Sequence, residues 1–89
     1  MTARSAAKAE ALGVKIAFTH EDVSYEMDPA MSWDLDAMEA FEDGNLVTCI
    51  RLILGPEQYA KFKPRGTKRT VGDLSALFET IQKAAGTPN

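Results

Sequence analysis

The segment from Val14 to Met27 reads VKIAFTHEDVSYEM, and it decides the fold class of this chain. Apolar and polar residues alternate on both sides of a polar break at 19–22, with the period of two that is typical of half-buried strands. Two such runs across a short polar break predict a β-hairpin over 14–27. An isolated hairpin is only marginally stable in water, so its apolar face must pack against the rest of the chain.

After Asp28 and Pro29, which end the hairpin, the apolar residues recur at helical spacing. We expect helices over about 32–43, 45–54, 56–63 and 71–85. The first should begin at Ser32 as N-cap, and the last should open on a capping box formed by Thr70 and Asp73. The predicted fold is therefore α+β and mainly α, with an N-terminal β-hairpin followed by a small bundle of three to four helices. The first helix should turn four residues inward: Trp33, Ala37, Met38 and Phe41.

The length of 89 residues fits one domain, which we place at 14–86. Residues 1–13 are Ala-rich and end at Gly13, so we expect a flexible or partly helical arm, and 87–89 form a short tail. Hydrophobic residues make up 45% of the chain and charged residues 26%, which excludes an intrinsically disordered chain. The longest apolar run, 46–54, contains Arg51 and is too short for a membrane span. We expect no secretory signal, and the single cysteine suits a reducing cytoplasm.

The residues that usually carry catalysis are sparse in this chain. His20 is the only histidine and lies in the predicted hairpin turn, where we interpret it as a solvated residue. Cys49 lies within an apolar helical run, which favours burial over nucleophilic work. The six glycines are scattered singly, so no Gly-rich phosphate loop is present, and no acidic loop has calcium-ligand spacing. We therefore expect no enzyme, no metal site and no cofactor.

Charge is distributed unevenly along the sequence. Residues 21–43 hold nine acids and no Lys or Arg, whereas residues 44–69 hold six bases and one acid, within a net charge of −3. Solvated faces are the plainest interpretation of this pattern. Opposite patches also suit the steering of a protein partner or a second copy of the chain. The basic loop could touch phosphates, but no aromatic residue lies between Pro64 and Thr70 and the acidic balance argues against nucleic acid.

Several of these segments together resemble a known family. The segments are WDLDAMEAFEDG at 33–44, LILGPEQY at 52–59 with Phe62, and TVGDL at 70–74 with Leu77 and Phe78. They are similar to the tail assembly chaperones of long-tailed bacteriophages that infect actinobacteria, in which a short β-rich start precedes a small helical body. The resemblance covers roughly 14–86, and its motifs are chiefly helix-packing and capping signals.

The resemblance implies a non-enzymatic assembly factor in the host cytoplasm that is absent from the mature virion. Its expected partners are the tape-measure protein, which it would keep soluble, and the tail-tube protein, whose polymerisation it would assist. We take four side chains as candidates to face this client: Met31, Trp33, Tyr59 and Phe62. The basic loop would contact tube protein or a second copy through Lys61, Lys63, Arg65, Lys68 and Arg69.

Two other functions fit the sequence. The predicted helix over 71–85 follows a basic loop, as a recognition helix of a small DNA-binding regulatory protein would, although Asp73 and Glu79 place acids on its exposed side. A structural head–tail connector subunit would instead be found in purified particles.

Overall fold

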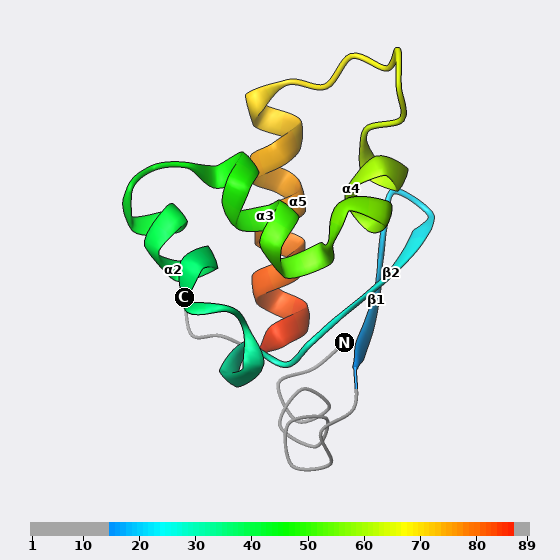
Figure 1. Ribbon diagram of the computed structural model, residues 1–89. Coiled ribbons are helices and arrows are strands. Elements are labelled where there is room, and N and C mark those ends of the chain that lie inside the picture. Colours follow the sequence, from blue (N-terminus) through cyan, green and yellow to red (C-terminus); the bar gives the residue numbers. More distant parts are fainter. Residues whose placement is uncertain (1–14, 87–89) are drawn as a thin grey trace.

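The computed structural model describes residues 15–86, and the predicted N-terminal arm, the start of the hairpin at Val14 and the C-terminal tail lie outside these residues. A two-stranded antiparallel hairpin precedes a 3-10 turn and four α-helices (Figure 1). The predicted class, α+β and mainly α, is confirmed. The elements are β1 (Ile16–His20), β2 (Val23–Met27), η1 (Ala30–Ser32), α2 (Leu35–Glu42), α3 (Leu46–Leu54), α4 (Pro56–Phe62) and α5 (Val71–Ala85).

The hairpin pairs Ile16 with Met27 and His20 with Val23, which leaves a two-residue turn. Glu21 and Asp22 form that turn with φ values of 50° and 64°, the pattern of a type I′ turn that follows the twist of the strands. The turn is therefore shorter than the four polar residues that the sequence suggested. His20 belongs to β1 rather than to the turn, and only 11% of its side chain is exposed, so its interpretation as a solvated turn residue is wrong.

Helix caps explain where two of the helices begin. The Asp34 side chain accepts a hydrogen bond from the Asp36 backbone N–H, so α2 starts after Asp34, and Ser32 ends the preceding 3-10 turn instead of capping the helix. At α5, Thr70 and Asp73 form the predicted capping box, in which each side chain accepts from the other residue's backbone N–H. The capping signal was correct at α5 and two residues early at α2.

The core lies between the inner face of the hairpin and the helices. The inward residues of the strands are almost completely buried: Ile16, Phe18, Tyr25 and Met27. β1 packs against α5, while β2 packs against α3 and α4, and α2 packs against α3 (Figure 1). α5 supplies the largest helical share of the core through Leu74, Leu77, Phe78, Ile81, Ala84 and Ala85.

The inward face predicted for the first helix is correct except at Phe41. Ala37 is fully buried, and Trp33 and Met38 pack against the core as partly buried residues. Phe41 is 47% exposed, although its ring stacks on Phe78 of α5 at 5.1 Å between centroids. The last turn of α2 thus covers α5 only at its edge. None of the helices between residues 15 and 86 has the length and hydropathy needed to cross a membrane.

Candidate functional site

An apolar depression lies where α3, α4 and the start of α5 converge. Its volume is about 180 Å³, and its apolar lining comes from Val47, Tyr59, Val71 and Leu74, with Phe62 beneath. Val47 is 41% and Val71 80% exposed, so the edges of this depression present apolar surface to solvent. Because this apolar surface is exposed, an apolar segment of a partner can pack on it.

A second depression, of about 520 Å³, adjoins the first along α4. It is lined by Arg51, Pro56, Tyr59, Ala60, Lys63 and Arg65. Tyr59 and Lys63 line both depressions. The two depressions are therefore parts of one continuous surface that meet at these residues. We call this combined surface the Tyr59 groove.

Among the described residues, the Tyr59 groove is lined by cations and by no carboxylate. The Arg51 guanidinium lies over the Tyr59 ring, 4.9 Å from its centroid, and this contact holds both side chains at the boundary of the two depressions. Arg51, Lys63 and Arg65 are exposed, and within residues 15–86 none of the three forms an ion pair. The positive charge around the apolar floor is therefore available to a partner.

Arg69 belongs to the internal structure rather than to the free basic loop. Its Nε donates to the Phe62 carbonyl at 2.8 Å, its Nη1 lies 2.8 Å from Glu21 Oε1, and its guanidinium carbon is 4.2 Å from the centre of the Phe62 ring. Only 22% of the side chain is exposed. Nε and Nη1 thus bind α4 and the hairpin turn, while Arg69 also lines the smaller depression, so its contact with another molecule stays a prediction.

Lys61 is also engaged within the molecule. Its Nζ donates to the Ser24 carbonyl at 3.3 Å and lies near the Tyr25 ring, while the Gln58 amide bonds to both the backbone N–H and the carbonyl of Glu26. Two α4 side chains therefore cover the outer edge of β2, which would otherwise offer unpaired backbone groups. Of the predicted basic set, Lys63, Arg65 and Lys68 remain exposed and without an ion pair among the described residues.

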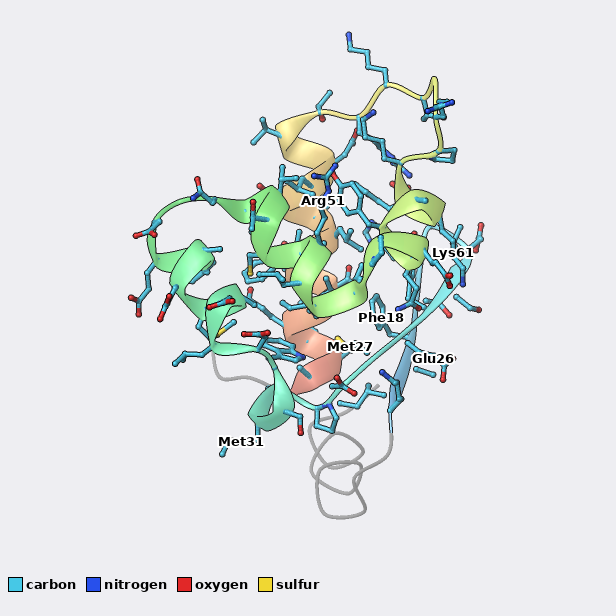
Figure 2. The ribbon with its side chains drawn as sticks, viewed as in Figure 1. Phe18, Glu26, Met27, Met31, Arg51 and Lys61 are labelled. Atoms are coloured by element: carbon cyan, nitrogen blue, oxygen red, sulfur yellow. The ribbon has the colours of Figure 1, made fainter. Side chains whose placement is uncertain are left out.

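The four predicted client-facing side chains do not form one surface. Met31 is 85% exposed and projects from the η1 turn, well away from Arg51 on α3 (Figure 2). Trp33 is partly buried, and its Nε1 donates to the Asp28 carbonyl at 2.8 Å. Phe62 is only 1% exposed, so the expectation that it faces a client is corrected: its ring is a core residue beneath Arg69. Tyr59, in contrast, lies in the groove, half-buried.

The two residues considered for chemistry are both internal. Cys49 is fully buried, as predicted, and burial raises the pKa of its thiol above the ordinary value of 9.0. His20 Nδ1 lies 2.9 Å from Thr80 Oγ1, and because Thr80 donates its own hydrogen to the Ala76 carbonyl, Nδ1 is the donor. His20 Nε2 is buried without a hydrogen-bond partner, 4.0 Å from Glu21 Oε2. No group of three metal-ligating side chains gathers within residues 15–86.

The groove residues that were not singled out from the sequence as binding candidates include Val47, Arg51 and Val71. Val47 and Val71 follow the apolar spacing of their helices, which is typical of buried positions. Arg51, inside an apolar run, was the one local signal of a solvent-facing position on α3. Comparison of the chain with protein-family models, with curated proteins and with solved structures found no match.

Proposed function

We propose that this protein is a phage tail assembly chaperone, which binds the tape-measure protein, keeps it soluble and assists polymerisation of the tail tube. The observation that carries the proposal is the Tyr59 groove, an apolar floor bordered by Arg51, Lys63 and Arg65, which form no ion pair among the described residues. Such a surface suits reversible binding of a protein segment. The resemblance of 33–44, 52–59 and 70–74 to tail assembly chaperones supplies the identity of the client.

A chaperone that uses no nucleotide acts by mass action: it lowers the free concentration of aggregation-prone segments by occupying them. Each contact should be weak, with a Kd of about 1 µM, so that arriving tube protein can displace the chaperone. Many copies along one long client supply avidity without tight individual contacts. The exposed acids of α2 and its flanks would keep the loaded complex soluble through mutual repulsion: Asp34, Asp36, Glu39, Glu42 and Asp43.

Co-expression tests the proposal. The tape-measure protein of the same phage should appear in the soluble fraction when this chain is present and in the pellet when it is absent. A Lys63→Glu/Arg65→Glu variant should lose this effect, because it reverses the charge of the groove at two exposed positions. The matched control Lys15→Glu/Lys83→Glu makes the same change in net charge on other elements and should retain it. A client that is equally insoluble in every case would contradict the function.

The proposal also makes the protein a transient partner, present in the host cytoplasm during assembly and absent from the mature virion. Mass spectrometry of purified particles should detect tube and tape-measure protein without this chain. Recovery of the chain in stoichiometric amounts would favour the head–tail connector instead.

A further inference from the structure

We propose that the Tyr59 groove binds an amphipathic α-helix whose apolar stripe is flanked by carboxylates. The inference rests on the proposed function for the source of the helix, which would be a segment of the client, but the recognition chemistry comes from the groove itself. Three features of the groove define this occupant: its walls, its charge and its floor.

The walls of the groove favour a helix over an extended peptide. All of its lining residues belong to α3, α4, α5 or the α4–α5 loop, and none belongs to a strand. The outer edge of β2 at Ser24 and Glu26 is already bonded by Lys61 and Gln58. An extended segment in the groove would therefore find no strand edge for its backbone N–H and C=O groups. A helix satisfies these groups internally and needs only side-chain contacts.

The charge of the groove selects a partner with acidic flanks. Arg51, Lys63 and Arg65 line the larger depression, and no carboxylate from residues 15–86 lines either depression. Because the three cations stand beside apolar surface, a helix with basic flanks would bring like charges together as it packed. Carboxylates one turn apart beside an apolar stripe would meet these cations while the stripe covers Val47, Val71 and Leu74.

The floor of the groove argues against nucleic acid as the occupant. Val47 and Val71 present exposed aliphatic surface, and the Arg51 guanidinium already lies over the half-buried ring of Tyr59. Bases of a single strand would need free aromatic faces on which to stack. The groove thus combines charge suited to carboxylates with a surface suited to aliphatic side chains.

Fluorescence anisotropy with designed peptides tests the inference. The probe is a labelled helix-forming peptide of about 18 residues, with Leu at i, i+3, i+4 and i+7 positions and Glu on both flanks. One matched peptide replaces every Glu by Lys, and another replaces every Leu by Ser. We expect binding of the Glu/Leu peptide with a Kd in the range of about 1 µM. Neither matched peptide should bind measurably.

Variants of the full chain locate the binding, with folding checked by circular dichroism. Lys63→Glu/Arg65→Glu should lower the affinity for the Glu/Leu peptide roughly tenfold. Val71→Ser should also lower this affinity, but without altering the salt dependence of binding. The control Lys15→Glu/Lys83→Glu should leave the affinity unchanged. Equal binding of the Glu and Lys peptides, or no effect of Lys63→Glu/Arg65→Glu, would overturn the inference.

Two further outcomes would assign the groove to another occupant. Self-association of the chain that disappears in Lys63→Glu/Arg65→Glu, with no peptide binding, would make a second copy the occupant. Binding of a labelled single-stranded oligonucleotide that is lost in the same variant, again with no peptide binding, would make it nucleic acid.

The co-expression result separates this inference from the proposed function. If the peptide binds as expected but the tape-measure protein stays insoluble, the function fails and the groove specificity stands. If the client becomes soluble but the peptide does not bind, the chaperone acts through another surface.

Discussion

Arg69 Nη1 lies 2.8 Å from Glu21 Oε1, and this ion pair joins the hairpin turn to the loop that leads into α5. The same side chain donates to the Phe62 carbonyl at the end of α4 and covers the Phe62 ring. One arginine thus links the loop before α5 to the end of α4 and to the hairpin turn, which is far away in the sequence. Arg69 is also one of the residues that line the smaller depression of the Tyr59 groove.

Replacement of Arg69 should destabilise the fold. Arg69→Ala should lower the free energy of unfolding by about 1–3 kcal/mol, because it leaves the Phe62 carbonyl without its donor and removes the cation from the ring. Arg69→Lys should recover only part of the loss, since one ammonium cannot make both contacts. Urea unfolding measures both values.

The ion pair itself should contribute less than the other Arg69 contacts. Glu21 is half exposed, so Glu21→Gln should cost no more than about 1 kcal/mol. A double-mutant cycle on Glu21→Gln and Arg69→Ala isolates the pair. An Arg69→Ala value no larger than that of Glu21→Gln would contradict the role given to the Phe62 contacts.

The hairpin turn offers a stabilising substitution. Asp22 has a φ of 64°, which a residue with a Cβ adopts at a cost, whereas glycine adopts it freely. Asp22→Gly should raise the free energy of unfolding by about 0.5 kcal/mol. This is the net effect, because the relief of backbone strain is partly offset by the larger conformational entropy that glycine loses on folding. Asp22→Ala, which keeps a Cβ, is the control and should give no gain. Urea unfolding of the two variants decides between turn geometry and simple loss of a charge.

The capping box of α5 should make stability depend on acid. The hydrogen bond from the Thr70 backbone N–H is the main cause that lowers the pKa of the Asp73 carboxyl below its ordinary value of 3.8. A carboxyl with a lowered pKa in the folded state contributes stability above pH 3.8, and this contribution is lost as the pH falls through the lowered value. Wild type should therefore be more stable than Asp73→Asn at pH 7, and this difference should shrink below pH 3.8. Thermal unfolding at several pH values measures this change.

Asp43→Asn is the control for this pH dependence, because the Asp43 carboxyl makes no hydrogen bond or ion pair with residues 15–86. Its pH profile should follow the wild type. A difference between wild type and Asp73→Asn that is the same at pH 7 and pH 3 would show that the carboxylate charge plays no part in the cap.

The Cys49 thiol should be unreactive in the folded protein. It is fully buried, and burial raises its pKa above 9.0, so little thiolate forms at neutral pH and none of it is accessible. A thiol-specific reagent at pH 8 should label the chain only as urea unfolds it, with the same midpoint as the unfolding curve. Rapid labelling in the absence of urea would contradict the burial of Cys49.

Local patterns in the sequence were sufficient to predict most of the fold. The alternation from Ile16 to Met27 identified the hairpin because one of its faces is buried and the other solvated. Thr70 and Asp73 identified the start of α5 because the cap uses residues only three positions apart. Each of these signals is complete within a few residues, so no knowledge of tertiary packing was needed.

The candidate site depends on contacts that no local pattern encodes. Arg51 meets Tyr59 only because the chain reverses at Gly55, where a φ of 87° sets the angle between α3 and α4. In the sequence, Arg69 is one of several cations in a basic loop, and its contacts with Glu21 and the Phe62 carbonyl come from distant or folded segments. His20 is likewise surrounded by polar residues in the sequence, whereas in the fold its ring lies against Thr80 of α5, 60 residues away. In each case, long-range packing decided which polar side chains remain available.

Light scattering of the client tests the central claim most directly. A purified tape-measure fragment diluted from denaturant should aggregate alone and remain clear when the wild-type chain is added, with saturation at several copies per client. Lys63→Glu/Arg65→Glu should fail to prevent aggregation, whereas Lys15→Glu/Lys83→Glu should act like wild type. Unchanged aggregation at every ratio of wild-type chain to client would contradict the account.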